Sequence, residues 1–99
     1  MGFWNLFGIG KQRKVIEEVL ANGAIVIDVR TREEYNQGHA ANSVNVPLDV
    51  IAGKVKKLKK MNKPLVLCCA SGMRSGTAVS ILKKQGIECY NAGRWTRIL

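Results

Sequence analysis

Two short, continuous apolar runs constrain the fold of this chain more than any other feature. They cover residues 24–28 (Ala-Ile-Val-Ile-Asp) and 65–69 (Leu-Val-Leu-Cys-Cys). A continuous apolar run of this length suits a strand that is covered on both faces, as in a parallel sheet. Both runs therefore predict buried strands, and each ends in a polar or reactive side chain, Asp28 or Cys69.

The segments between these runs carry helix and turn signals. Apolar residues at helical spacing predict helices over residues 11–21, 49–60 and 75–85. Thr31 and Glu34 have the spacing of a capping box, which predicts a brief helix closed by Gly38. Short strands are expected over residues 43–46 and 87–90, and no element is assigned to residues 91–99.

Strands that alternate with helices in units this short are typical of a parallel α/β sheet. We expect one α/β domain over residues 1–99, with a small, central, mainly parallel sheet of four to five strands and helices on both faces. Ligand sites in such sheets lie beyond the carboxyl ends of the strands. Asp28 and Cys69 are therefore predicted to share one crevice.

The net charge of +9 is unevenly distributed along the chain. Residues 1–40 carry five basic and five acidic side chains, whereas residues 41–99 carry eleven and two. A positive field around a cleft raises the encounter rate of small anions. A dense lysine cluster also raises the alternatives of nucleic acid or an acidic membrane. The favoured interpretation is the solvated face of a helix, with no nucleic-acid partner; the cluster comprises Lys54, Lys56, Lys57, Lys59, Lys60 and Lys63.

The first residues and the cysteines bear on compartment and cofactors. Residues 1–10 are apolar but lack the charge pattern and cleavage site of a signal peptide, and no run approaches the roughly 20 apolar residues of a membrane span. This segment either packs across the core or docks a partner or membrane.

Three cysteines and the single His39 fit neither a disulfide framework nor a zinc site. We expect a cytoplasmic protein without a metal or another cofactor.

Cys69 opens a loop of small residues that runs into a helix. The free amides of such a loop and of the first helical turn, with the positive end of the helix dipole, point at whatever the loop holds. These surroundings lower the pKa of a thiol and favour the reactive thiolate. The same donors would hold an anionic substrate.

Five segments in order resemble the signatures of a single-domain rhodanese. They are Asp28-Val-Arg30-Thr-Arg-Glu-Glu34-Tyr35, Gly38-His39, Ser43-Val-Asn45-Val-Pro47, Cys69-Ala-Ser-Gly-Met-Arg-Ser75 and Asn91-Ala-Gly93-Arg-Trp95. The resemblance implies a rhodanese-like domain with sulfurtransferase activity. Cys69 would take sulfur from thiosulfate or a persulfide, and cyanide, a thiol or a partner protein would then remove it. It also implies a substrate-binding loop of Ala70, Ser71, Gly72, Met73, Arg74 and Ser75.

Loop length separates this chemistry from that of the cysteine-dependent phosphatases. Those enzymes place five residues between cysteine and arginine, whereas four residues separate Cys69 from Arg74 here. The shorter loop is too tight for a phosphomonoester, so phosphatase or arsenate reductase activity is not expected. Arg74 is instead expected to bind the sulfonate end of thiosulfate.

The remaining candidate residues have structural alternatives. The resemblance implies that Asp28, a supporting residue, orients the loop or pairs with an arginine, although it could instead cap a helix or turn. Arg30 is likewise interpreted as a supporting structural partner, with a substrate contact as the alternative. Cys68 and Cys89 favour core packing, although either could be a redox partner of Cys69. His39 favours a structural hydrogen bond, and Trp95 a lid on the core or the cleft rim.

Two other functions stay open beside the sulfurtransferase. One is a sulfur-carrier or docking module that passes a persulfide between dedicated partners with little turnover on free thiosulfate. The other is a thiol redox sensor that pairs Cys69 with Cys68 or Cys89.

Overall fold

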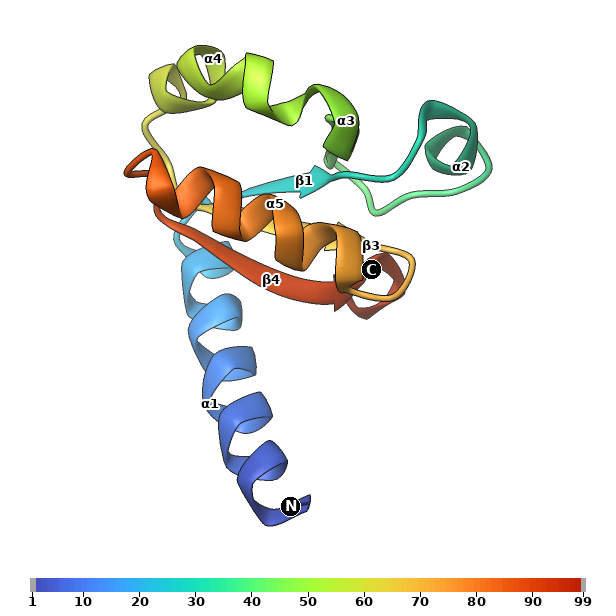
Figure 1. Cartoon of the computed structure of the whole chain (residues 1–99). Coiled ribbons are helices and arrows are strands. Elements are labelled where there is room, and N and C mark those ends of the chain that lie inside the picture. The colour runs from blue at the N-terminus through green and yellow to red at the C-terminus, as the bar shows by residue number, and fades with distance from the viewer. Residues whose placement is uncertain (1, 99) are drawn as a thin grey trace.

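The computed structural model describes the backbone of residues 2–98 and the side chains of residues 12–98. Helices and strands alternate along the chain (Figure 1). In order they are α1 (Gly2–Ala21), β1 (Ile25–Asp28), α2 (Arg32–Asn36), β2 (Val44–Asn45), α3 (Leu48–Ile51), η1 (Ala52–Lys54), α4 (Val55–Lys60), β3 (Leu65–Cys69), α5 (Met73–Lys84), β4 (Cys89–Arg94) and η2 (Trp95–Ile98).

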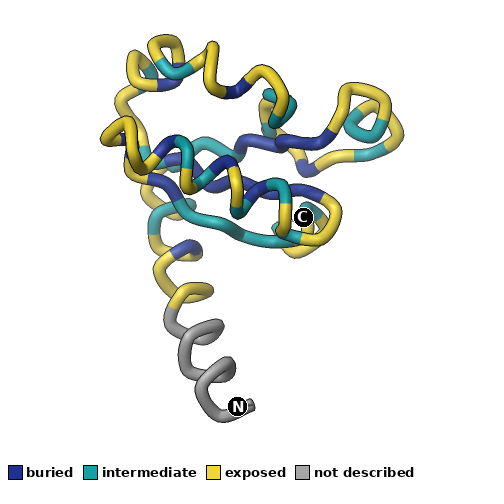
Figure 2. The backbone as a smooth tube through the Cα atoms, in the orientation of Figure 1, coloured by how far each residue is buried: buried dark blue, intermediate teal, exposed yellow. Residues whose placement is uncertain are grey.

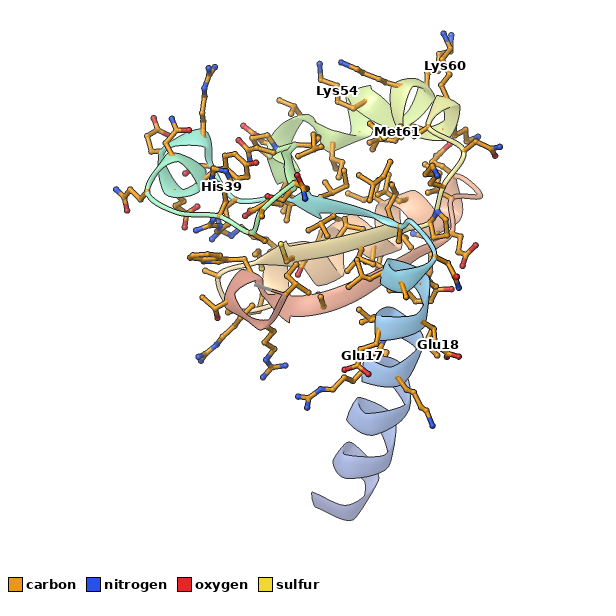
Figure 3. The ribbon with its side chains drawn as sticks, turned by 180° about the vertical axis from the view of Figure 1, so that it is seen from behind. Glu17, Glu18, His39, Lys54, Lys60 and Met61 are labelled. Carbon is orange, nitrogen blue, oxygen red and sulfur yellow. The ribbon has the colours of Figure 1, made fainter. Side chains whose placement is uncertain are left out.

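The described strands form one parallel sheet of four strands in the order β2-β1-β3-β4. Helices α3 and α5 contact each other on one face of this sheet, as right-handed crossovers require. Helix α5 lies in front of the strands in Figure 1 and behind them in Figure 3. Helix α1 lies against β4 on the other side. The predicted α/β class, the parallel sheet and the helices on both faces are confirmed.

The core lies between the sheet and helices α3 to α5. Figure 2 shows β3 buried, β4 mostly of intermediate burial, and much of α4 exposed. Alternate residues of β3, Leu65, Leu67 and Cys69, belong to this core, whereas Val66 and Cys68 are buried on the opposite face. The predicted burial of β3 on both faces is therefore confirmed.

The helix expected over residues 49–60 and the last strand differ from the structure, as does the start of the first helix. The helix expected over residues 49–60 is broken by η1, which contains Gly53, the residue that weakens a helix at this place. The last strand was expected over residues 87–90 but runs from Cys89 to Arg94. Helix α5 ends in a Schellman motif, in which the Ile87 amide donates to the Leu82 carbonyl at 3.1 Å. Ile87 is thereby held at the helix end and not in the strand.

The first helix is longer than expected. It begins at Gly2 instead of residue 11, and it ends at Ala21, as predicted, just before Asn22 and Gly23, where Gly23 has φ 96°. Gly8 and Gly10 each weaken a helix, but propagation costs less than nucleation, so the helix extends backward through them. The expectation that the side chains of residues 1–10 pack across the core lies outside the described residues.

Substitution by alanine should have opposite effects on stability at two glycines. Gly53→Ala should stabilise the protein by about 0.4–1 kcal/mol, because a Cβ at Gly53 meets nothing within 4 Å. Gly72→Ala should destabilise it by about 1–2 kcal/mol, because Gly72 has φ 97° and a Cβ there would stand 3.2 Å from Gly93 Cα. Urea unfolding followed by circular dichroism measures both changes. Shifts of equal sign would contradict this account.

Candidate active site

The candidate site lies where the strand order reverses, at the carboxyl ends of β1 and β3. In the strand order β2-β1-β3-β4, the chain passes from β1 to β2 in one direction and from β3 to β4 in the opposite direction. The place between β1 and β3 is therefore the topological switch point of the sheet. Asp28 ends β1, and Cys69 ends β3 beside it. The two residues are thus brought to one end of the sheet, as predicted.

The loop after β3 surrounds the Cys69 sulfur with hydrogen-bond donors. The amide of Gly72 donates to Sγ at 3.0 Å, and the amide of Ser75 donates at 3.4 Å. The Ser75 hydroxyl lies 3.4 Å from the same sulfur. Gly72 caps α5 in the left-handed conformation, which turns these amides inward. Met73, by contrast, is 79% exposed.

These contacts change the acidity of the thiol. Burial alone would raise the pKa of Cys69, but hydrogen bonds from the Ser75 side chain and from the loop amides outweigh burial. The pKa of Cys69 therefore lies below its ordinary value. The other cysteines behave in the opposite way, because burial raises the pKa of Cys68 to about 12 and also raises that of Cys89. Among the three cysteines, only Cys69 has a pKa that its surroundings lower.

Asp28 and Arg30 form a buried ion pair next to the loop. The guanidinium of Arg30 donates to both carboxylate oxygens of Asp28, with the shortest contact at 2.9 Å, and to the Gly38 carbonyl at 2.7 Å. Trp95 covers this guanidinium at 4.7 Å from its ring centroid. The pairing expected for Asp28 is present, and Trp95 lies over Arg30 as a lid.

Arg74 forms an ion pair that the sequence did not indicate. Its guanidinium donates to both carboxylate oxygens of Glu34, at 2.7 and 3.0 Å. Glu34 also completes the predicted capping box of α2 with Thr31. The Arg74 guanidinium, followed by the Thr31 amide, lowers the pKa of Glu34 to about 2. These partners are 40 positions apart in the chain, so no local pattern announced the pair.

Asn91 joins the loop to β4 and was not identified as a site residue from the sequence. Its Nδ2 donates to the Gly72 carbonyl at 3.0 Å, and its Oδ1 accepts from the Gly93 amide at 2.9 Å. The Ser75 hydroxyl lies 2.7 Å from the same oxygen. An asparagine two positions before a glycine is a signal for such an Asx turn.

A groove of about 790 Å³ opens beside the loop. Helix α1 forms one wall, and the loop, the end of β4 and η2 form the others. Arg13 and Arg97 line it together with the apolar Ile16 and Leu20. Glu17 also lines the groove, which therefore combines two arginines and one carboxylate with apolar surface next to Ser71 and Gly72.

His39 and the lysine cluster lie away from the sulfur chemistry. The His39 ring stacks on Tyr35 with centroids 3.7 Å apart, and Nδ1 lies 2.8 Å from the Tyr35 carbonyl oxygen, which confirms its structural role. Lys54 and Lys60 point outward in Figure 3, while Ile51 and Leu58 of the same segment are buried. This arrangement agrees with a solvated helix face.

Two observations on the described residues concern metals and membranes. Among the side chains of residues 12–98, no group of three or more His, Cys, Asp or Glu residues is placed to hold a metal ion. Over the same part of the chain, no helix is both long and apolar enough to cross a membrane.

Comparison with known proteins identifies the family. The family model described as a rhodanese-like domain matches residues 12–93, so the chain belongs to this family. A solved structure described as a rhodanese with anions from E. coli superposes with a TM-score of 0.69 at 31% identity, covering 77% of this chain and 92% of that chain.

Two curated relatives are longer than this chain. A Thermoplasma acidophilum protein named tRNA sulfurtransferase is 33% identical over 67 residues, which are 68% of this chain and 13% of that protein. The uncharacterized protein YqhL of Bacillus subtilis is 36% identical over 69 residues, covering 69% of this chain and 54% of YqhL. This chain therefore spans only part of the length of these relatives.

The ion pair between Glu34 and Arg74 predicts a pH dependence. The pKa of Glu34 falls on folding from 4.5 to about 2, so the pair stabilises the protein fully above pH 4.5 and is lost as the pH falls toward 2. Both side chains are 36% exposed, so screening limits the effect to about 1 kcal/mol or less.

Glu34→Gln tests this dependence, because glutamine retains an oxygen for the capping box. Its stability deficit relative to the natural chain should shrink as the pH falls from 4.5 toward 2, measured by urea unfolding at each pH. The matched control, Glu33→Gln, changes an exposed residue and should show a smaller change with pH. A Glu34→Gln deficit that stays constant over this range would count against the pair.

Proposed function

We propose that this protein is a sulfurtransferase that carries sulfur as a persulfide on Cys69. One observation carries the proposal: the Cys69 sulfur receives amide hydrogen bonds from Gly72 and Ser75 at the start of α5. Such an arrangement favours a negatively charged sulfur, which is the reactive form of the thiol and the charge state of a persulfide. Membership in the rhodanese-like family supports the same reaction type.

The first half of the reaction loads the cysteine. The Cys69 thiolate attacks the outer sulfur of thiosulfate, forming a new sulfur–sulfur bond. The bond between that outer sulfur and the sulfonate sulfur breaks, and sulfite leaves with the electron pair. Because Cys69 is fully buried, the donor must be small enough to enter the loop.

The second half returns the sulfur to an acceptor. Cyanide or a thiolate attacks the outer persulfide sulfur, the sulfur–sulfur bond breaks, and the Cys69 thiolate is restored. With cyanide the product is thiocyanate. The groove lined by Arg13 and Arg97 offers space beside the loop for an anionic acceptor larger than cyanide.

A sulfur carrier that serves dedicated partners is the second candidate. Burial of Cys69 favours it, because a buried persulfide is protected from free thiols. The redox sensor that pairs Cys69 with Cys89 receives less support. In the sheet register, Cys89 pairs with Leu65, which lies four positions before Cys69. That separation is about 13 Å along the strand, whereas a disulfide needs Cα atoms within about 7 Å.

Thiocyanate formation from thiosulfate and cyanide tests the proposed function. The natural chain should produce many equivalents of thiocyanate per protein, and Cys69→Ser should produce none above the uncatalysed rate. Cys89→Ser is the matched control and should keep most of the activity, since Cys89 lies at the other end of the sheet. Full activity in Cys69→Ser would exclude Cys69 as the sulfur carrier. A yield that stops at one equivalent per protein would favour the carrier over the enzyme.

If Arg74 binds the anionic donor, the rate of sulfur transfer should depend on the charge of the donor. Arg74→Ala should reduce kcat/KM for thiosulfate about tenfold, because a charge-assisted contact of about 1.5 kcal/mol is lost. The rate of persulfide formation from an uncharged persulfide or polysulfide donor should fall less. Single-turnover kinetics with both donors measure this ratio. Equal losses for both donors would contradict an anion-binding role of Arg74.

A further inference from the structure

The Ser75 hydroxyl stands between two acceptors but has one proton to give. Asn91 Oδ1 is 2.7 Å from Ser75 Oγ, and Cys69 Sγ is 3.4 Å from it. Ser75 and Cys69 are both fully buried, so bulk solvent does not reach the contact between them. The direction of this one proton therefore determines whether the sulfur faces a hydrogen-bond donor or an oxygen lone pair.

The amide orientation of Asn91 is fixed by two backbone groups. The Gly93 amide is a donor and requires Oδ1 opposite it, at 2.9 Å. The Gly72 carbonyl is an acceptor and requires Nδ2 opposite it, at 3.0 Å. A flipped amide would oppose donor to donor and acceptor to acceptor at both places. The atom that faces Ser75 is therefore an oxygen, which only accepts.

It follows that the Ser75 hydroxyl donates to Asn91 in this structure. Its oxygen then presents a lone pair to Cys69, which suits a thiol that donates its own proton to Ser75. An anionic sulfur facing the same lone pair would be repelled. When Cys69 becomes a thiolate or a persulfide, the hydroxyl must turn to the sulfur and release Asn91 Oδ1, which keeps its bond from Gly93.

We propose that Asn91 is a positioning residue that competes with Cys69 for the single hydroxyl proton of Ser75. Asn91 holds this proton while the sulfur is neutral and yields it when the sulfur is charged. The inference rests on the proposed function only in taking Cys69 as the reacting group. It adds a residue on β4 to the control of that group.

A double-mutant cycle separates this role from simple support of the loop. The measurement is a pH titration of the ultraviolet absorbance of the thiolate, taken as the difference from the Cys69→Ser form of each variant. No sulfur donor is present, so failure of the proposed function in the thiocyanate assay would leave this test intact. The other groups coupled electrostatically to the sulfur are Arg74 and Cys68, and the cycle leaves both unchanged. Asp28 acts on both of these groups in turn and is also unchanged.

Asn91→Ala should move the titration midpoint to lower pH, because Ser75 is then free to donate to the sulfur. The thiolate fraction below the midpoint should rise about fivefold, the factor expected for one net hydrogen bond. Ser75→Ala should move the midpoint to higher pH. With alanine at position 75, the further change Asn91→Ala should leave the midpoint nearly unmoved.

Equal shifts from Asn91→Ala in both backgrounds would overturn the proposal, since they would reflect the loop alone. A shift to higher pH in the natural background would overturn it as well. Should Asn91→Ala fail to fold by circular dichroism, Asn91→Asp replaces it in the cycle. Aspartate holds the hydroxyl proton more strongly, so its upward shift should be larger with Ser75 than with alanine, and equal shifts would refute the competition.

Discussion

The loop between β3 and α5 keeps its shape because two backbones meet without side chains between them. Gly72, at φ 97°, lies so close to Gly93 that a Cβ would stand 3.2 Å from its Cα. Asn91 adds a hydrogen bond to the Gly72 carbonyl, but the turn itself is set by the left-handed Gly72 and its contact with Gly93. With the turn held there, the amides of Gly72 and Ser75 point at the Cys69 sulfur. The acidity of the thiol is a consequence of this close packing.

Two separate ion pairs lie near the Cys69 sulfur. The buried pair of Asp28 and Arg30 closes the end of β1 and is covered by Trp95. Arg74, the first cationic residue after Cys69, is paired with the Glu34 carboxylate. An anionic donor would thus compete with a carboxylate for Arg74, whereas the backbone amides at the sulfur remain free of such competition. In the proposed reaction, Arg74 would act mainly on the donor, and the loop amides mainly on the acidity of the thiol.

The sequence was sufficient where local chemistry decides the structure. The apolar runs identified β1 and β3, the spacing of Thr31 and Glu34 identified the capping box, and Cys69 followed from the strand, loop and helix around it. The sequence was insufficient where contacts between distant residues determine the structure. The extension of β4 to Arg94 depends on register with β3, because Asn91 and Gly93 alone favour a turn. The Glu34 to Arg74 pair and the position of Asn91 against Ser75 likewise depend on the closed fold.

The most direct test of the central claim is to locate the transferred sulfur. Protein treated with thiosulfate and freed of excess donor is measured by intact mass and then by peptide mapping under nonreducing conditions. The account predicts a gain of one sulfur atom, confined to Cys69 and removed by cyanide. A gain located on Cys68 or Cys89, or no gain in the natural chain, would contradict it.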